Sequence, residues 1–440
     1  MAKTKKIPLI EDFNNIPAES LVPEEEQPYP LPAHWKWVRL GQVTEVVSGG
    51  TPKTTVPEYW DNGEIPWLTP ADLSGYSERY ISRGFKNITL KGVAHSSATL
   101  FPKGTVCLST RAPIGYVAIA ENEMSTNQGF KSFIPGPLVM SEYLAIYLKG
   151  SKSLLESMAS GTTFLELSKS KAGLIPFPLA PLEEQKQIVA YLDDKLGKID
   201  SVRGKLQDFL DHAAQRKDNL IQAGVTGHLT SHWREEHNAH LNDWQLKQIS
   251  DLGEVVTGST PSTKNPEYYG GQIPFVKPAD LDAGRYIKSA QSFLSQAGAK
   301  VSRMLPAKTV AVCCIGSLGK CGLIEVPAAT NQQINSIIPR SGTHAVYLYY
   351  LCSSPKFKAA MIEKSSSTTL SILNKSRFSK LEFSIPTMGE QEEIARILDE
   401  QLECIERTDK LVAEVLERLD TMKQQIVSAA LAGRLSLQVP

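Results

Sequence analysis

The 440-residue sequence lacks the long hydrophobic runs that would tie a protein to a membrane. No stretch approaches the roughly 18 consecutive apolar residues that a membrane-spanning helix requires. The first residues, MAKTKKIPLIEDF, also lack the extended apolar region of a secretory signal peptide. We therefore predict a cytoplasmic protein without membrane association.

Cysteine is scarce, and no C-x-x-C pair occurs. Unevenly spread cysteines without such pairs favour reduced, buried thiols over a disulfide framework or a zinc site. Four histidines cluster in the sequence, but no cysteine or acidic set completes a metal site beside them, so we predict no metal centre. The cysteines are Cys107, Cys313, Cys314, Cys321, Cys352 and Cys404, and the clustered histidines are His228, His232, His237 and His240.

The chain also has no net charge, with 47 Lys and Arg against 47 Asp and Glu. The charges are nevertheless unevenly distributed. Residues 35–180 contain 14 basic and 11 acidic residues, and residues 244–386 contain 16 and 8, so the two segments carry +3 and +8. Locally positive surfaces are compatible with binding of a polyanion. Uneven surface charge without a function is the alternative.

What the sequence does contain is a long internal repeat, which covers almost everything after residue 35. Each copy is about 200 residues long, far longer than a solenoid repeat, so the repeat indicates a tandem domain duplication. The matched stretches include EVVSGGTPKTTVPEYWDNGEIPWLTPADL and EVVTGSTPSTKNPEYYGGQIPFVKPADL, STNQGFKSF and ATNQQINSI, SGTTFLELSKSKAG and SSTTLSILNKSRFS, and PLEEQKQIVAYLD and MGEQEEIARILD.

Within each copy a strand-rich part precedes a helical part. Short β-branched runs such as GTVCLST and KTVAVCCI, separated by Gly and Pro, are typical of a compact mixed α/β domain. Apolar residues then recur at steps of three and four from Ile188 to Leu220 and from Ile394 to Ile426, which predicts coiled-coil helices. Gly227 and Gly433 are predicted to end these helices.

Each predicted helix has about 40 residues and would be roughly 60 Å long. One amphipathic helix of that length cannot bury its apolar stripe alone, and the intervening domain is long enough for the second helix to return antiparallel to the first. Gly197 and Gly204 would each cost about 1 kcal/mol relative to Ala unless close helix approach uses them. Two unconnected surface helices in separate domains are the alternative. The predicted fold class is α/β (α+β), with two mixed domains, an antiparallel two-helix coiled coil and pseudo-twofold symmetry.

The motifs EVVSGGTP, STNQ, SGTT, PLEEQKQIVAYLD and GVTGHLTSHWRE, most of them present in both copies, resemble the specificity subunit of type I DNA restriction-modification systems (the HsdS family). The resemblance spans roughly residues 35–435. It implies that each globular part is a target recognition domain reading one half of an asymmetric bipartite site in double-stranded DNA, while the coiled coil sets the spacer. The expected segments are an N-terminal extension (1–34), recognition domain 1 (35–180), the first helix (181–230), recognition domain 2 (231–386) and the second helix (387–440).

The resemblance also implies partners that perform the chemistry. Two modification (methyltransferase) subunits would bind this chain and methylate adenine N6 with S-adenosylmethionine, and two restriction (motor-nuclease) subunits would use ATP and Mg. No cofactor is expected in this chain itself. The extension, acidic around PEEEQ, matches no repeat and is interpreted as a flexible or partner-contacting segment.

Catalytic motifs are missing from the chain itself. An adenine methyltransferase would need a cofactor loop and an Asn/Asp-Pro-Pro-aromatic element; NPEYY at Asn265 lacks the second proline. GSLGKCG at Gly316 does not satisfy G-x-x-x-x-G-K-[ST] and is interpreted as a structural loop. We therefore predict a non-enzymatic chain. A scaffold that binds protein partners without DNA is the alternative, and a self-contained restriction-methylation enzyme is disfavoured.

The duplication separates two classes of candidate DNA contact. If the halves read different sequences, residues shared by both copies cannot discriminate bases and are better candidates for scaffold or phosphate contacts; these are Gly49/Gly258, Thr51/Thr260, Pro52/Pro261, Asn127/Asn331 and Gln128/Gln332. Polar positions near them that diverge between the copies are the predicted reading residues: Lys53, Thr54, Arg111, Lys131, Lys169 and Lys171 in the first copy, and Thr263, Lys264, Ser317, Lys320, Lys375 and Arg377 in the second. For any one of them, a solvated surface position is the simpler alternative.

Overall fold

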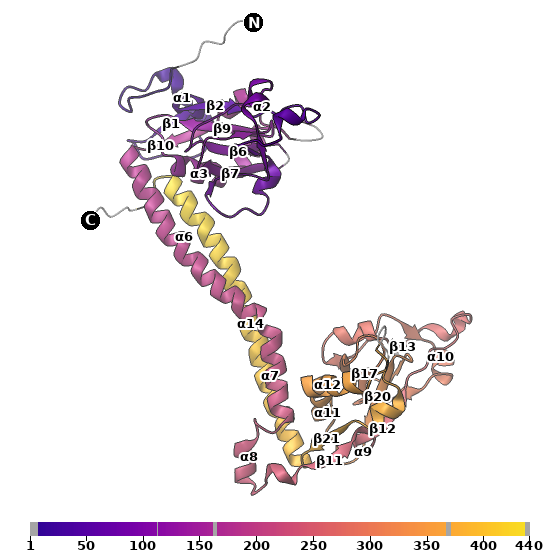
Figure 1. Ribbon diagram of the computed structural model, residues 1–440. Coiled ribbons are helices and arrows are strands. Elements are labelled where there is room, and N and C mark those ends of the chain that lie inside the picture. Colours follow the sequence, from indigo (N-terminus) through magenta and orange to yellow (C-terminus); the bar gives the residue numbers. More distant parts are fainter. Residues whose placement is uncertain (1–7, 112, 162–164, 367–370, 436–440) are drawn as a thin grey trace. The chain divides into compact units, whose positions relative to one another are not determined.

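The computed structural model describes residues 8–111, 113–161, 165–366 and 371–435, and the chain divides into two compact units (Figure 1). Unit 1 consists of residues 1–205 and 415–440, and unit 2 of residues 206–414. Each unit therefore combines one globular part with segments of the long helices. Among the described residues, no helix is both long and apolar enough to cross a membrane.

Unit 1 is built on a five-stranded sheet in the order β2-β9-β6-β7-β4, with a three-stranded sheet β5-β3-β8 and a ribbon β1-β10. The large sheet is antiparallel except for the β4–β7 pair. Its elements are β1 (Lys36–Arg39), α1 (Leu40–Val43), β2 (Thr44–Ser48), β3 (Ile65–Leu68), β4 (Tyr80–Ile81), β5 (Lys86–Ile88), α2 (Leu90–Ala94), β6 (Val106–Thr110), β7 (Ile114–Ala120), β8 (Ser125–Thr126), β9 (Phe130–Pro135), α3 (Ser141–Gly150), α4 (Lys152–Met158), α5 (Lys169–Gly173) and β10 (Pro176–Leu179).

Unit 2 repeats this topology, which confirms the duplication. Its sheets have the orders β12-β20-β17-β18-β14, β15-β13-β19-β16 and β11-β21. The elements are α8 (Ser231–Glu236), β11 (Gln245–Gln248), α9 (Ile249–Leu252), β12 (Gly253–Thr257), β13 (Tyr269–Val276), β14 (Tyr286–Ile287), β15 (Phe293–Leu294), α10 (Gln296–Lys300), β16 (Met304–Leu305), β17 (Val310–Cys313), β18 (Cys321–Ile324), β19 (Ala328–Thr330), β20 (Ile334–Pro339), α11 (Ala345–Ser353), α12 (Pro355–Lys364), α13 (Lys375–Ser379) and β21 (Glu382–Ile385).

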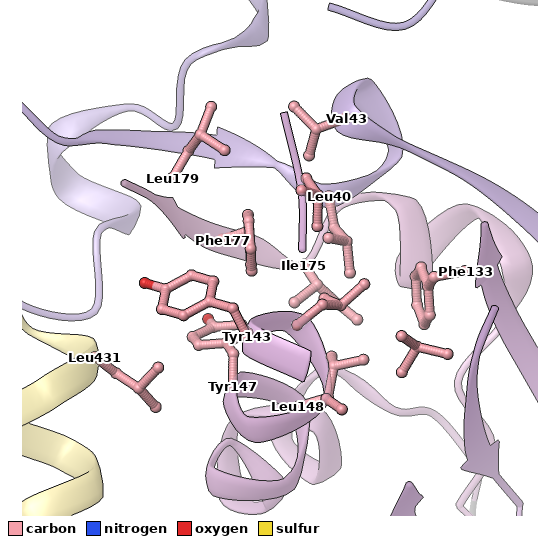
Figure 2. Packing of buried hydrophobic residues seen from close by; sticks show 14 of the residues in the cluster. Leu40, Val43, Phe133, Tyr143, Tyr147, Leu148, Ile175, Phe177, Leu179 and Leu431 are labelled. Atoms are coloured by element: carbon pink, nitrogen blue, oxygen red, sulfur yellow. The ribbon is translucent and has the colours of Figure 1, made fainter. Parts of the chain in front are cut away.

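The main core of unit 1 lies between the large sheet, the β1-β10 ribbon and α3 (Figure 2). The rings of Tyr143 and Tyr147 on α3 meet Phe177 on β10 edge-on, with centroids 5.7 and 5.4 Å apart. The Tyr143 hydroxyl donates to the Pro178 carbonyl at 3.0 Å, so this buried polar atom is satisfied. Leu431, near the end of the second long helix, also packs into this core.

Residues 8–34 pack on unit 1, so the interpretation of the extension as a flexible segment is wrong for this part. Ile10 and Val22 are buried in the core of unit 1. The Val22 amide donates to the Trp37 carbonyl at 3.0 Å, and the Trp37 indole N–H donates to the Tyr29 carbonyl at 3.0 Å. The apolar side chains are widely spaced along an acidic, proline-rich stretch, which concealed them in the sequence.

The long helices are α6 (Leu182–Asp211), α7 (Ala213–Val225) and α14 (Met388–Leu431). Ion pairs between them fix the direction of pairing within each unit. In unit 1, Lys423 contacts Asp200 at 2.5 Å and Arg203 contacts Asp420 at 3.1 Å; in unit 2, Arg216 contacts Asp409 at 2.6 Å and Lys217 contacts Glu406 at 3.0 Å. In both units the residue numbers of the paired side chains increase along one helix as they decrease along the other, which confirms antiparallel pairing.

Five glycines clarify how the helices approach and end. A Cβ on Gly224 would lie 2.8 Å from Leu398, so this glycine permits close helix packing. Gly197 and Gly204, by contrast, have open space beside them, so they do not serve close approach. Gly227 and Gly433 have φ of +79° and +64° just past the ends of α7 and α14, which confirms them as helix stops.

Candidate nucleic-acid interface

In each unit, four loops meet at one end of the five-stranded sheet. In unit 1, the strand pairing brings together three of these loops: the loop after β2, the loop before β9 and the loop between β6 and β7. The segment before α5 is the fourth loop, and it lies beside the end of β6 because the Leu167 amide donates to the Thr110 carbonyl at 3.0 Å. In unit 2, the Leu373 amide donates to the Cys314 carbonyl at 2.9 Å in the equivalent place. We call these two sheet ends the loop rims.

Shared residues form the framework of both rims. A Cβ on Gly49 would lie 1.9 Å from the Asn127 carbonyl oxygen, and one on Gly258 would lie 2.1 Å from that of Asn331, so only glycine fits. The side-chain oxygens of Asn127 and Asn331 accept backbone N–H bonds two residues on, at 2.9 and 3.1 Å. These contacts support the scaffold interpretation of both pairs.

The shared threonine and glutamine residues are placed differently. Thr51 donates to Gln128 and Thr260 donates to Gln332, each at 2.5 Å, and all four residues are exposed. Each unit thus presents the same hydrogen-bonded pair at its rim. A sequence-independent contact, such as one to a phosphate oxygen, is the role that an identical exposed pair suits.

The predicted reading residues of unit 1 divide by exposure. Lys53, Thr54, Arg111 and Lys169 are exposed around the loop rim. Lys131 lies on β9, is only 6% exposed and directs its ammonium group to the Gln128 carbonyl at 3.4 Å. Burial lowers the pKa of Lys131. Its placement gives a direct DNA contact the least support.

In unit 2, Thr263, Lys264 and Ser317 are exposed at the equivalent rim, and so are Lys375 and Arg377 on α13. Lys320 is partly buried and forms an ion pair of 2.6 Å with Asp282. Lys320 would have to leave this acidic partner to contact DNA.

The structure also corrects the separation of shared and divergent positions. Lys171 donates to the Met158 carbonyl at 2.8 Å, and Arg377 approaches the Lys364 carbonyl at 3.4 Å, so the two cations hold the ends of α4 and α12 in the same way. Lys169 and Lys375 stand at the first positions of the equivalent helices α5 and α13. By the reasoning applied to shared residues, these four positions suit scaffold or phosphate contacts better than base discrimination.

Sequence reasoning missed a neighbouring feature of unit 1. A cleft of about 310 Å³ is lined by Thr54, Trp60, Lys86 and Asn87. The Lys86 ammonium lies 5.8 Å from the Trp60 ring centroid, and the Trp60 indole N–H donates to the Lys53 carbonyl at 3.1 Å. The aligned repeats differ at Lys86, where the second copy has a serine, and this difference was the available signal.

The thiols and potential metal ligands do not form a reactive centre within the described residues. All six cysteines are described, and none forms a disulfide. Burial raises the pKa of Cys107 and of Cys321 to about 12, so both remain protonated thiols at neutral pH. Among the described residues, no group of three or more His, Cys, Asp or Glu is placed to hold a metal ion.

Comparisons with known proteins agree with this architecture. The family described as "Type I restriction modification DNA specificity domain" matches residues 32–208 and 242–417. The MjaIX specificity subunit of Methanocaldococcus jannaschii is 35% identical over 296 residues, covering 62% of this chain and 64% of the relative. The HindI specificity subunit of Haemophilus influenzae is 37% identical over 147 residues, covering 33% and 32%. The chain thus spans less than two thirds of the length of these relatives.

A solved structure extends the similarity of fold over nearly the whole chain. The HsdS subunit from Thermoanaerobacter tengcongensis superposes with a TM-score of 0.66 at 18% identity, covering 93% of this chain and 100% of that one. The sequence family covers both copies of the repeat, and the fold similarity covers the helices as well. The protein therefore belongs to the type I restriction-modification DNA specificity family.

Proposed function

We propose that the chain is the sequence-specificity subunit of a type I restriction-modification complex, and that each unit reads one half of an asymmetric bipartite DNA site. The observation that carries this proposal is that both units build the same loop rim from shared residues and present different side chains on it. Such an arrangement suits one docking geometry used on two sequences. The relatives' names point the same way, because those proteins are specificity subunits of type I restriction enzymes.

The proposed base-reading residues are those exposed at the rims that differ between the copies. Arg111 is exposed in unit 1. Its backbone forms an isolated antiparallel β-bridge with that of Glu166, and the backbones of Ile315 and Ile372 form the equivalent β-bridge in unit 2. An arginine can bond guanine O6 and N7 together, and a good bidentate contact gives about 1–3 kcal/mol of discrimination. Replacing Arg111 by Ala should relax selectivity in one half-site only; unchanged selectivity would remove it from the reading set.

We further propose that the paired helices set the spacer between half-sites and dock two methyltransferase subunits. Antiparallel pairing within each unit supports a fixed register. Several large apolar side chains on these helices are exposed, among them Val202, Val415 and Met422 in unit 1 and Phe209 and Leu411 in unit 2. Exposed apolar side chains of this kind suit contact with partner proteins.

The chemistry in this proposal belongs to the partners. The chain itself would be non-catalytic and need no cofactor, whereas the modification subunits would bind S-adenosylmethionine and methylate adenine N6. Two restriction subunits would supply ATP- and Mg-dependent motor and nuclease activity. The complex would act on cytoplasmic DNA.

We retain residues 35–180 and 231–386 as the proposed recognition domains, with the helical segments 181–230 and 387–440 between and after them. Contacts within the units support a close association of domain and helix. The buried Glu390 of α14 accepts hydrogen bonds from Thr230, Arg234 and Trp244. The extension, residues 1–34, adds to unit 1 through its packed residues.

Methylation mapping tests the proposal directly. Cells that express this chain with its modification partner should contain N6-methyladenine in a single bipartite motif with two unlike half-sequences and a constant gap. Expression of the partner without this chain is the control and should give no such motif. A single uninterrupted motif without a gap, or the same methylation pattern in cells that lack this chain, would contradict the proposal.

A salt-dependent gel shift separates this function from a scaffold that binds only proteins. Binding of a random duplex should weaken steeply as salt rises, because the protein displaces counterions from the phosphates. A scaffold without a DNA function would show no shift at low salt.

A further inference from the structure

One exposed aromatic residue lies next to the loop rim of unit 1 and has no counterpart in unit 2. Phe85 precedes β5, and its side chain is 87% exposed, more than any other large hydrophobic residue described. Exposing a phenylalanine to water forgoes the free-energy gain that burial would give. A partner that covers the ring is therefore a natural explanation.

The backbone that presents Phe85 is held rigidly. Asp72 accepts a hydrogen bond from the Phe85 amide at 2.6 Å with Oδ1, and bonds from the Thr69 amide and hydroxyl at 2.6 and 2.7 Å with Oδ2. A Cβ on Gly84 would lie 2.7 Å from Asp72 Oδ1 and 3.0 Å from Leu68, so this glycine allows the close approach. The ring is consequently displayed on a fixed support.

Unit 2 has the same support without the aromatic ring. Asp280 accepts a bond from the Gln291 amide at 2.9 Å with Oδ1 and from the Lys277 amide at 2.7 Å with Oδ2. Gln291 therefore occupies the position of Phe85. The four residues at the tip read Arg83-Gly84-Phe85-Lys86 in unit 1 and Ser-Ala-Gln-Ser in unit 2, at positions 289–292. The two backbone N–H bonds to the aspartate are common to both copies, whereas the glycine, the threonine hydroxyl and the aromatic and basic side chains belong to unit 1 alone.

The surroundings of this aromatic tip favour nucleic acid as its partner. Arg83 and Lys86 flank the ring in sequence and are exposed, and within the described chain Arg83 forms no hydrogen bond or ion pair. The tip adjoins the loop rim, since Trp67, which pairs with Lys86 across β3 and β5, donates its indole N–H to the Gly50 carbonyl at 2.9 Å. Cations suit phosphates, and an apolar wedge between them suits a base step.

We infer that the Arg83–Lys86 tip inserts Phe85 against a base-pair step of the DNA bound by unit 1, with Arg83 and Lys86 on the flanking phosphates. This inference rests on the proposed DNA-reading function and deepens it, because it assigns a wedge to one unit and none to the other. The two half-sites are then read by different means. Deformability of the step beside Phe85 contributes to selectivity in the first half-site only.

Three variants of the full chain, each assembled with its modification subunits, test the inference on a duplex carrying the methylation-mapped site. Phe85→Gln installs the side chain that unit 2 carries on the same support. The double variant Arg83→Ser/Lys86→Ser removes the flanking cations. Leu246→Gln, at an exposed apolar residue of β11 in unit 2, is the matched control for loss of apolar surface.

The expected results differ between the variants. Phe85→Gln binds about tenfold more weakly, the order of a lost base-stacking contact, and reduces the DNA bend measured by energy transfer between the labelled ends of the duplex. Arg83→Ser/Lys86→Ser lowers the slope of log affinity against log salt by about 2, because two phosphate contacts are lost. Leu246→Gln leaves affinity, bend and slope unchanged.

Unchanged affinity and bend in Phe85→Gln, with the thermal stability of the chain intact, would overturn the inference. So would a variant that binds DNA normally as a free chain but fails to assemble with the modification subunits, since the ring would then contact protein. If the complex that contains the wild-type chain shows no preference for the mapped duplex, the proposed function itself fails. A normal wild-type preference together with an unaffected Phe85→Gln variant rejects the wedge alone.

Discussion

At the scale of single residues, a buried glutamine joins helix and globular part in each unit. Gln185 on α6 is fully buried; its amide accepts from the Met140 N–H at 2.9 Å and donates to the Leu138 and Ala180 carbonyls at 2.9 and 2.8 Å. Gln391 makes the equivalent bonds in unit 2. Only a side chain with both donor and acceptor can satisfy these backbone groups.

Replacing Gln185 by Leu should therefore destabilise unit 1. The change leaves buried backbone groups without partners, at about 1–3 kcal/mol each, and should lower the melting temperature by about 4 °C or more. Thermal unfolding of the full chain measures the effect. The exposed Gln207, which donates to Asp211 alone, is the control; an equal loss in Gln207→Leu would show that the buried bonds are unimportant.

A second residue-scale contact pins the sheet edge of each unit to its long helix. Arg79 binds Asp193 of α6 at 3.0 Å. Arg285 binds Asp399 of α14, also donates to Tyr350, and stacks on Tyr286 at 4.2 Å. The ion pairs alone are partly exposed and contribute about 1 kcal/mol or less. Unit 2 has the additional stacking and hydroxyl contacts.

We therefore expect Arg285→Ala to loosen unit 2 more than Arg79→Ala loosens unit 1. Hydrogen exchange of the amides of β14 and β4 provides the measurement, with faster exchange expected in both variants and the larger increase in β14. Equal increases would indicate that the ion pair alone anchors each edge and that the contacts of Arg285 with Tyr286 and Tyr350 add nothing.

At the same scale, the duplicated sequence predicted the scaffold better than it predicted exposure. The glycine and asparagine pairs were identifiable because two copies must fold alike. Lys131 was misleading because its place on β9, facing the interior, depends on strand register, which one sequence does not reveal. Lys171 and Arg377 differ in identity yet hold equivalent carbonyls, so sequence divergence alone did not separate reading residues from structural ones.

At the scale of elements, the helix glycines have opposite expected effects. Gly197 and Gly204 lie on α6 beside open space, so replacing either by Ala should stabilise the chain by about 1 kcal/mol through helix propensity. Gly224→Ala should destabilise it, because the new methyl group would press against Leu398. Melting temperatures of the three variants give the test, and a higher melting temperature in Gly224→Ala would contradict close packing of Gly224 against Leu398.

The elements themselves were largely predictable. Steps of three and four located the long helices, and short β-branched runs separated by Gly and Pro located the sheets, because both signals are local in the sequence. The interruption at His212, between α6 and α7, was not predicted, since no proline or glycine marks it. The packing of residues 8–34 was also missed, because it depends on a few long-range contacts that leave no periodic signal.

At the scale of the whole molecule, the proposed function turns on the helices that both units share. Residues of α14 belong to unit 2 up to Glu414 and to unit 1 from Val415. Facing ion pairs occur in both units, so the helices pair antiparallel within each unit. Under the proposed function, helix length should determine which gap between half-sites is accepted, while the rims determine the half-sequences.

Inserting one heptad into both long helices at facing positions should separate these two properties. Suitable sites lie between Arg203 and Asp211 in α6 and between Asp409 and Asp420 in α14, where the ion pairs define the register. Seven residues add about 10 Å, equivalent to about three base pairs, and a heptad preserves the seam. Methylation mapping should return the same half-sequences with a longer gap. A heptad in α6 alone breaks the register and should abolish methylation, whereas an unchanged gap in the double insertion would show that something other than the helices sets the spacing.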